Sequence, residues 1–231
     1  MSELRQSSRG GNPQAQRERA LGTRMTIVSV ARGLFADAGY HFTGTNEIAA
    51  CAKLTRGALY HHFTDKDDLF AAVFRQVAIE LDERAKSAVA SLSGDLWPQV
   101  TQAFRHYLAL VTASAEYRRI LLIDGPAVLG WARWRDMQSE FVGQGTANAL
   151  QMLMDQGLVA PRPTMALASL IQAALHDAAL TIAHAAQPSK AAEEATDAFF
   201  FLLDGIRHIP VIAQASLNDT ECGQALPGLR T

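Results

Sequence analysis

The sequence predicts an all-α protein with a three-helix head of about 50 residues on a larger helical body. Apolar side chains recur with the 3.6-residue period of a helix through most of the chain. Alternating runs of Val, Ile and Thr between turns, which mark strands, are absent from the sequence. With 231 residues and 48% hydrophobic content, the chain can bury one good core, or a small domain on a larger one.

A first helix is expected to begin near residue 23. Residues 1–22 are rich in Gly, Gln, Arg and Ser, and we expect a flexible basic arm there. Gly39 stands where a helix favours a left-handed C-terminal cap. Between these limits, apolar side chains lie on one helical face, at Ile27, Val30, Ala31, Leu34, Phe35 and Ala38.

Two short helices joined by a tight turn at Lys53 are expected next. Thr45 and Thr55 are expected to cap their N-termini, because a threonine hydroxyl can accept a hydrogen bond from a free backbone amide. Asp65 is then expected to cap a fourth helix, with Asp68 placed to return the contact as in a capping box.

The body is expected to be helical throughout, with breaks at Asp124-Gly125-Pro126 and at Ala160-Pro161-Arg162-Pro163. A loosely ordered tail is expected over residues 214–231. The candidate helices have boundaries good to about two to four residues and cover roughly 95–114, 116–123, 131–156, 164–187 and 189–213.

Charge is distributed unevenly along the chain, whose net charge is -2. Residues 1–64 hold eight Lys and Arg against four Asp and Glu, whereas residues 65–231 hold 13 against 19. A basic end on an acidic body indicates that this end meets a polyanion, although a solvated surface with chance asymmetry fits the same counts.

Cysteine usage and hydropathy favour a cytoplasmic protein. Cys51 and Cys222 lie far apart, which fits a reduced protein without a disulfide framework. The polar N-terminus lacks an apolar signal core, and charged or polar residues interrupt the longest apolar windows. We therefore expect no membrane partner.

Two short helices after a longer one are typical of a helix-turn-helix. The second helix would enter the major groove of DNA with small or polar side chains at its N-terminal end. Gly57 would allow close approach, and Arg56 could bind guanine or phosphate. Tyr60 and His61 follow on the outward side, while Leu59 packs inward. We therefore expect a DNA-binding head.

The stretch Thr43–Leu69, TGTNEIAACAKLTRGALYHHFTDKDDL, resembles the DNA-binding head of the TetR/AcrR family of repressors. The resemblance covers roughly residues 24–75. It implies an all-α homodimer whose C-terminal domain binds a small apolar or amphipathic molecule and thereby releases operator DNA. It also implies which side chains lie at the DNA surface, namely Thr45, Thr55, Arg56, Gly57, Tyr60, His61 and Lys66.

Lys53 departs from the pattern of that family, which usually has glycine at this turn. If the turn requires a left-handed residue, lysine costs about 1 kcal/mol or more there. Its side chain could also add a phosphate contact. On these grounds the chain divides into a basic arm at 1–22, a helix-turn-helix domain at 23–68, a ligand-binding and dimerisation domain at 69–213, and the tail.

The pair His61-His62 raises the question of a metal site. Adjacent residues on a helix point about 100° apart, so the two rings cannot easily share one ion. We expect His61 to face DNA and His62 to lie on the flank of the head, and two solvated histidines remain the alternative. No metal and no cofactor are expected.

The body is expected to supply a self-pairing surface and a ligand site. The last two long helices are rich in small residues and favour a four-helix dimer interface at Leu170, Ala174, Ala178, Phe199, Phe200 and Leu203. These residues could instead pack inside one subunit. Candidate ligand contacts, each of which could also be ordinary core, are Phe104, Tyr107, Leu108, Leu122, Trp131, Trp134 and His176.

Two other classes of protein stay open from the sequence. An all-α enzyme is disfavoured because the G-x-S-x-G, Walker, H-E-x-x-H and C-x-x-C motifs are absent. A ligand-independent DNA-binding protein is disfavoured because about 140 further residues are not needed to position a small head. The sequence therefore favours a ligand-responsive transcriptional regulator, with a repressor as the first choice.

Overall fold

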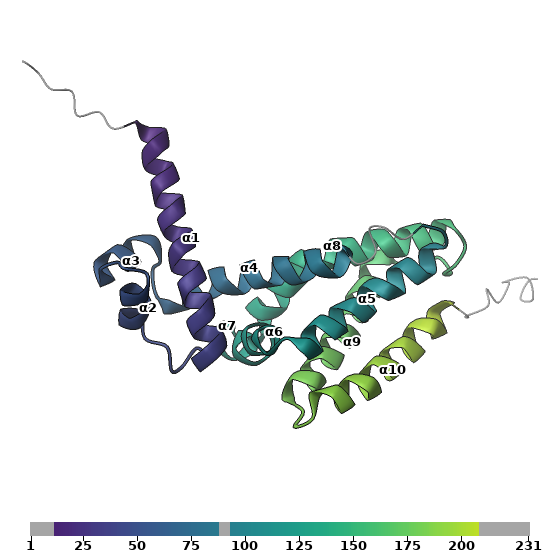
Figure 1. The fold of residues 1–231 in the computed structure, drawn as a ribbon. Helices are drawn as coiled ribbons and strands as arrows, with labels where there is room; N and C mark the ends of the chain where they lie inside the picture. Colours follow the sequence, from purple (N-terminus) through teal and green to yellow (C-terminus); the bar gives the residue numbers. More distant parts are fainter. Residues whose placement is uncertain (1–11, 88–92, 208–231) are drawn as a thin grey trace, which may run out of the picture.

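The computed structural model of the protein describes residues 12–87 and 93–207 (Figure 1). Every regular element in these two ranges is a helix, which confirms the all-α prediction. In chain order the elements are α1 (Pro13–Ala38), α2 (Thr45–Cys51), α3 (Arg56–His62), α4 (Lys66–Ser87), α5 (Leu96–Ala113), α6 (Ala115–Tyr117), the π-helix η1 (Arg118–Asp124), α7 (Gly125–Leu129), α8 (Trp131–Asp155), α9 (Thr164–His184) and α10 (Pro188–Arg207).

Helices α1, α2 and α3 form the head, and α4 runs from it into the body (Figure 1). The three head helices bury apolar side chains against one another and against the start of α4. Phe35, Ile48, Leu59 and Leu69, one from each helix, are all fully buried. The head therefore owes its shape to the apolar periodicity that the sequence predicts.

Helix α1 begins ten residues earlier than predicted from the sequence. It starts at Pro13, whose ring suits the first turn of a helix because no amide is required there. The side chain of Asn12 caps it by accepting a hydrogen bond from the amide of Gln14 at 3.0 Å. Residues 13–22 of the expected flexible arm are therefore helical, and residues 1–11 lie outside the described ranges.

Most of the predicted caps are present. The hydroxyl of Thr55 accepts from the amide of Ala58 at 3.1 Å. Asp65 accepts from the amide of Asp68 at 2.7 Å, and the carboxylate of Asp68 accepts from the amide of Thr64 at 3.1 Å. Thr45 is the exception, because Gly44 is the N-cap of α2 and Thr45 is its first helical residue.

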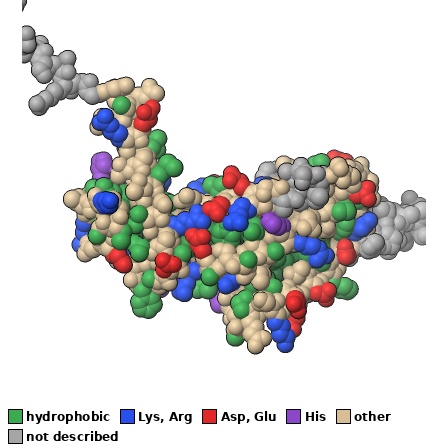
Figure 2. Space-filling view, in the orientation of Figure 1, with side chains coloured by type: hydrophobic (Ala, Val, Ile, Leu, Met, Phe, Trp, Pro, Cys, Tyr) green, Lys and Arg blue, Asp and Glu red, His purple; other side chains and the backbone are tan. Residues whose placement is uncertain are grey.

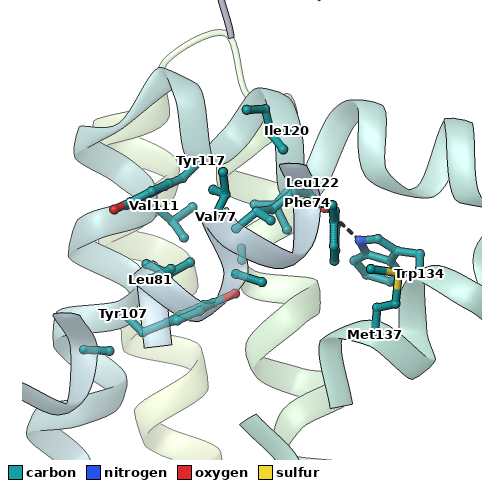
Figure 3. Packing of buried hydrophobic residues seen from close by; sticks show 14 of the residues in the cluster. Phe74, Val77, Leu81, Tyr107, Val111, Tyr117, Ile120, Leu122, Trp134 and Met137 are labelled. Atoms are coloured by element: carbon teal, nitrogen blue, oxygen red, sulfur yellow. Dashed lines mark hydrogen bonds between the residues drawn. The ribbon is translucent and has the colours of Figure 1, made fainter. Parts of the chain in front are cut away.

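The body packs α4, α5, α8, α9 and α10 side by side, with α9 between α8 and α10. Figure 3 shows the centre of this core, where side chains of α4, α5, η1 and α8 converge. Trp134 is almost fully buried there, and its indole donates a hydrogen bond to the carbonyl of Leu121 at 2.7 Å. This bond satisfies the one polar atom that a tryptophan brings into an apolar core.

The predicted break at Asp124-Gly125-Pro126 is not a loop. The π-helix η1 runs through Asp124 directly into α7, and the chain turns at Gly130, which has a φ of 74°. Gly125 lies against the core, where a Cβ atom would come within 2.9 Å of Phe74 and of Trp134. Glycine is therefore required here for close packing, not for a turn.

The C-terminal end of the body differs slightly from the prediction. Helix α9 ends at His184 and α10 at Arg207 within the described residues. The rest of the expected last helix and the predicted tail over 214–231, which includes Cys222, lie outside the described ranges.

Helix α9 is the one helix among the described residues that is long and apolar enough to cross a membrane. Length and composition alone give this result, and 44% of the residues in its apolar window are buried inside the protein. Its contacts with α8 and α10 account for its apolar character, because a helix covered on both sides in a core is expected to be apolar.

Candidate functional site

The turn between α2 and α3 has the geometry of a Schellman motif. The amide of Leu54 donates to the carbonyl of Ala49 at 2.9 Å, and the amide of Lys53 donates to the carbonyl of Ala50 at 3.0 Å. Lys53 is the one non-glycine residue with positive φ among the described residues, at 57°. The turn therefore requires the left-handed conformation that makes lysine costly there.

Helix α3 separates its side chains into a buried and an exposed set. Leu59, together with Phe63 at the C-cap, is at most 1% exposed and fixes the helix against the head. Gly57 has open space around it, since an added Cβ atom would meet only the hydroxyl of Thr55, at 3.9 Å. The exposed residues of the helix and its cap are Thr55, Arg56, Gly57, Tyr60 and His61.

Tyr60 connects the exposed faces of α2 and α3. Its hydroxyl lies 3.4 Å from the hydroxyl of Thr45, and the guanidinium of Arg56 lies 5.4 Å from the centre of its ring. The hydrogen bond with Thr45, and next the one with Arg56, lowers the pKa of the Tyr60 phenol. Thr45, Arg56 and Tyr60 therefore form one polar cluster on the surface, with a cation at its edge.

Lys66 is half-buried and lies over the ring of Tyr40, with 3.9 Å from its ammonium to the ring centre. Burial lowers the pKa of Lys66, and its acidic neighbours Asp67 and Asp124 oppose this shift. Tyr40 is also hydrogen-bonded to Asp67, and burial followed by this bond raises the pKa of its phenol. Lys66 is thus less open to DNA than the side chains of α3.

The two adjacent histidines are arranged as the helix dictates. The rings of His61 and His62 are 5.5 Å apart and nearly perpendicular, with His61 exposed and His62 half-buried. No group of three His, Cys, Asp or Glu residues suited to a metal ion occurs within the two described ranges. Figure 2 shows the exterior of the head beside a body on which acidic and basic side chains alternate.

An ion-pair network joins the head to the body. Arg32 of α1 contacts Glu80 of α4 at 2.6 Å and Glu116 of α6 at 2.6 Å. Tyr117 donates to Glu80 at 2.9 Å and accepts from Arg84 at 2.9 Å. The hydrogen bonds that Arg32 donates to Glu116 and to Glu80 raise its pKa, and Arg32 is the main cause of the lowered pKa of Glu80.

A second contact between α1 and the body lies at the C-terminal end of η1. Together with the Arg32 network it forms what we call the α6–η1 joint. The buried carboxylate of Asp124 accepts from the amide of Tyr40, directly after α1, at 2.9 Å. Gly39 is positioned there at φ 85°, where a Cβ atom would come within 2.9 Å of the Arg119 guanidinium. Both ends of the α6–η1 segment therefore hold the last turns of α1.

The body contains a partly open cavity of about 240 Å³ between α4, α5, α8 and α9. Two of the predicted ligand contacts, Phe104 and Tyr107, lie in its wall. Most of the lining was not predicted from the sequence, because many of its residues are small or polar and form no pattern that marks a cavity. The other residues that line the cavity are Asp82, Ala85, Lys86, Leu96, Gln99, Val100, Ala103, Gly145, Thr146, Ala149 and Leu175.

The remaining predicted ligand contacts lie elsewhere. Leu108, Leu122 and Trp134 are buried in the core, whereas Trp131 is 60% exposed at the start of α8. His176 is buried with its ring 5.8 Å from that of Trp134, and its Nε2 atom has no hydrogen-bond partner among the described residues. Burial lowers the pKa of His176 to about 4, so the ring is neutral at physiological pH.

Several predicted dimer contacts pack inside the subunit. Phe199 lies 5.6 Å from Phe104, and the guanidinium of Arg105 lies 3.8 Å over Phe200. Leu203 and Ala178 are also buried, whereas Leu170 is 68% exposed and Ala174 is partly exposed. This placement differs from the expected contact surface because the run FFFLL covers all sides of a helix, so composition alone cannot show which residues face outward.

The exposed apolar side chains of α9 and α10 form a different set. Leu202 and Ala174 line one shallow groove between the two helices, and Leu170 and Ile206 line another. Phe201 is 79% exposed and Leu202 is 62% exposed. Helical phase gives the signal that could have found this face, because Ala198, Leu202 and Ile206 follow one another at intervals of four residues.

Both parts of the fold match known protein families. Residues 27–73 match the model of bacterial regulatory proteins of the tetR family, and residues 97–206 match the tetracyclin repressor-like C-terminal domain. A TetR-family transcriptional regulator from Pectobacterium atrosepticum is 37% identical in sequence with a TM-score of 0.75. That match covers 83% of this chain and 97% of the other. The chain belongs to the TetR family.

Curated relatives agree with this assignment. The transposon Tn10 TetC protein of Escherichia coli is 29% identical over 139 residues, which are 60% of this chain and 68% of TetC. The regulator AcrR of Shigella flexneri is 35% identical over 106 residues, so the match spans about half of each protein, 46% and 49%. As a TetR-family protein, the chain is a DNA-binding transcriptional regulator and not an enzyme.

Proposed function

We propose that this TetR-family regulator represses transcription by binding a pseudo-palindromic operator as a homodimer and leaves the operator when a small apolar or amphipathic molecule binds. The observation that carries the proposal is the exposed face of α3, held by buried Leu59 and Phe63 and joined through Arg32 to a body that contains a cavity. Relatives described as transcriptional repressors support the sign of the regulation.

In this proposal α3 enters the major groove. Arg56 and Tyr60 contact bases or phosphates, Gly57 permits close approach, and Thr55 and His61 lie beside them. Phosphates are contacted by Thr45 at the start of α2, by Lys53 in the turn, and by Lys66 in the first turn of α4 after it moves off the Tyr40 ring. The exposure of these residues, with Thr45 and Lys66 the half-buried members, supports the assignment.

The homodimer is proposed to form through α9 and α10, as a four-helix interface with the same two helices of a second copy. The contact surface consists of the exposed Leu170, Ala198 and Leu202 with the partly exposed Ala174 and Ile206, and it replaces the buried phenylalanines named from the sequence. Large apolar side chains that are more than 60% exposed, such as Leu170 and Leu202, support an interface because isolated subunits rarely leave them uncovered together.

The effector is proposed to bind in the cavity of the body and to act on the head through the α6–η1 joint. Helices α4 and α5 contribute to the cavity wall, while α4 and α6 also carry the carboxylates that hold Arg32 of α1. A movement of α4 therefore shifts the head. Coupling of this kind is reciprocal, so operator DNA lowers effector affinity by the same factor by which the effector lowers operator affinity.

The division into domains is proposed to follow this joint. Helices α1–α3, up to about residue 68, form the DNA-binding unit, and α4–α10 form the ligand-binding and dimerisation unit, with α4 shared. The expected place of action is the cytoplasm, where bacterial DNA is found. RolR, a solved structure of similar fold with a TM-score of 0.65 at 16% identity, is in complex with the ligand resorcinol, and this supports a small-molecule effector.

The first experiment is selection of bound DNA from a random pool by the purified full chain, read by sequencing at a fixed salt concentration. We expect an enriched inverted repeat whose half-sites are about one helical turn of DNA apart, as a symmetric dimer requires. Salt-sensitive binding without an enriched sequence would contradict the proposal of an operator.

Arg56→Ala then tests the placement of α3 on the selected operator. We expect a loss of about 1–3 kcal/mol in binding free energy and relaxed specificity at one base pair, measured by fluorescence anisotropy. Arg135→Ala is the matched control, because it removes the same charge from an exposed site on α8, outside the proposed interface. Equal operator affinity of the two variants would show that α3 does not enter the groove as proposed.

Leu202→Glu tests the interface. A carboxylate in the centre of an apolar contact should shift the chain from dimer to monomer in sedimentation velocity. Met152→Glu is the control, because Met152 of α8 is also exposed, at 51%, and lies outside the proposed interface. If both variants remain dimers, the α9–α10 interface is wrong.

A further inference from the structure

Within the described residues, each polar side chain that lines the body cavity has a hydrogen-bond or ion-pair partner, with one exception. Asp82 and Lys86 form an ion pair with 2.6 Å between their charged atoms. The amide of Gln99 donates to the carbonyl of Gly94 at 3.1 Å, and the hydroxyl of Thr146 accepts from Gln172 at 3.5 Å. None of these groups presents an uncompensated charge to the interior of the cavity.

The exception is Tyr107. It is 5% exposed, lies in the cavity wall, and its hydroxyl makes no hydrogen bond with any part of the chain that the structure describes. Figure 3 shows its oxygen directed inward among the buried side chains of the core. Burial alone raises the pKa of the phenol, so it remains a neutral donor at physiological pH. The hydroxyl is therefore free to donate to a molecule in the cavity, and an oxygen on that molecule can accept the hydrogen bond.

The size of the cavity bounds the molecule. An apolar cavity of about 150 Å³ accommodates benzene. The cavity here measures about 240 Å³, which leaves room for one ring and a short substituent. Apart from Tyr107, the deeper wall is formed by apolar side chains such as Val100, Phe104 and Leu175.

We propose that the cavity selects a small, uncharged, largely apolar molecule that carries one oxygen acceptor, and that the hydroxyl of Tyr107 donates a hydrogen bond to this oxygen. This inference rests on the proposed effector site and names the class of compound that the site takes. A carboxylate of the same size is rejected, because the cation of Lys86 is already neutralised by Asp82 and the wall offers no second positive charge.

Three probes of one size test this selection, each titrated into the full chain without DNA and followed by ligand-observed NMR at neutral pH. Acetophenone carries the carbonyl acceptor, ethylbenzene replaces it by a methylene group, and benzoate replaces it by a charge. We expect acetophenone to bind the wild-type protein most tightly, ethylbenzene about fivefold to tenfold more weakly, and benzoate most weakly.

Tyr107→Phe removes the proposed donor and keeps the ring. It should abolish the preference of the protein for acetophenone over ethylbenzene, because ethylbenzene never used the hydroxyl that is lost. Tyr117→Phe is the matched control. Its hydroxyl bonds Glu80 and Arg84 and is not part of the cavity wall, so the preference should persist while the melting temperature falls.

An unchanged preference in Tyr107→Phe, benzoate binding as tight as that of acetophenone, or no binding of acetophenone at millimolar concentration would each overturn the inference. The operator selection distinguishes a failure of this inference from a failure of the proposed function. A recovered operator with no probe selectivity removes only the ligand class. Probe selectivity that depends on Tyr107, without an operator, leaves the site in place and removes the proposed repressor function.

Discussion

The head and the body of this protein derive their functional surfaces from the sequence in different ways. In the head, α2, the turn and α3 lie within Thr45–His62, so local periodicity and capping decide which side chains face outward. In the body, the cavity is assembled from four helices, and its lining extends from Asp82 to Leu175. The exposed residues of a surface formed by sequence neighbours can be predicted from the sequence. The residues that line a cavity depend instead on how distant helices pack.

The α6–η1 joint between the head and the body is a third region, formed neither by sequence neighbours nor around a cavity. Arg32 meets carboxylates that lie 48 and 84 residues away along the chain. The π-helix η1 places Asp124 against the amide after Gly39, and such helices are frequent at functional sites. Changes in the head, in the body and in the joint can therefore test whether the three regions act as described.

The largest expected effect is in the core of the head. Phe63→Ala removes a ring that is 1% exposed and should lower the free energy of unfolding by about 3–5 kcal/mol, with loss of operator binding. Phe42→Ala removes the same ring from a side chain that is 86% exposed, and should change stability by less than about 0.5 kcal/mol. Urea denaturation measures both, and equal losses would mean that the head is not packed as described.

In the body, His176 should make stability depend on pH. Its pKa is about 4 in the folded protein and near 6.5 when unfolded, so the unfolded state binds a proton first as pH falls. The free energy of unfolding should therefore drop by about 3 kcal/mol between pH 6.5 and 4 because of this group. His176→Leu should remove this share of the pH dependence.

His184 on the same helix is the control for this prediction, because its side chain is exposed. The pH profile of His184→Leu, obtained by chemical denaturation at several pH values, should follow that of the wild-type protein. If His176→Leu and the wild-type protein lose stability in parallel between pH 6.5 and 4, the imidazole is not held neutral by burial.

At the joint, Arg32→Ala leaves Glu80 and Glu116 without their shared cation and should destabilise the protein by about 1–3 kcal/mol. Arg84→Ala removes a more exposed cation from the same network and should destabilise the protein less than Arg32→Ala does. Arg32 lowers the pKa of Glu80, so its contribution is present above about pH 4.5 and is lost as pH falls further. Thermal denaturation of both variants near pH 7 and near pH 3 checks the size and the pH dependence together.

The sequence predicts the fold and the exposed face of α3 because both depend on helical period and on short capping motifs. Thr55 and Asp65 cap their helices as predicted, and Lys53 adopts the left-handed conformation that its position implied. The start of α1 was placed too late, because a polar stretch that lacks an apolar face can still be helical when Asn12 and Pro13 begin it.

The body was predicted less completely for two physical reasons. Glycine and proline usually end helices, yet Gly125 is needed for its lack of a side chain against Phe74, and the chain continues through it. In α10, three consecutive phenylalanines cannot share one face, so Phe199 and Phe200 are buried and Phe201 is exposed. Which of them meets the neighbouring helix is decided by packing that no local pattern encodes.

The smallest predicted effect concerns Lys53, where stability and DNA binding should change in opposite directions. Lys53→Gly relieves a left-handed residue at φ 57° and should stabilise the protein by about 1 kcal/mol. If the lysine also contacts a phosphate, the same change should weaken operator binding and reduce the slope of log affinity against log salt by about 1. Lys53→Ala separates the two effects, because it loses the charge but keeps a Cβ atom in the left-handed conformation, so it should weaken binding without the gain in stability. A salt slope that is the same in all three proteins would leave Lys53 a strained turn residue with no part in DNA contact.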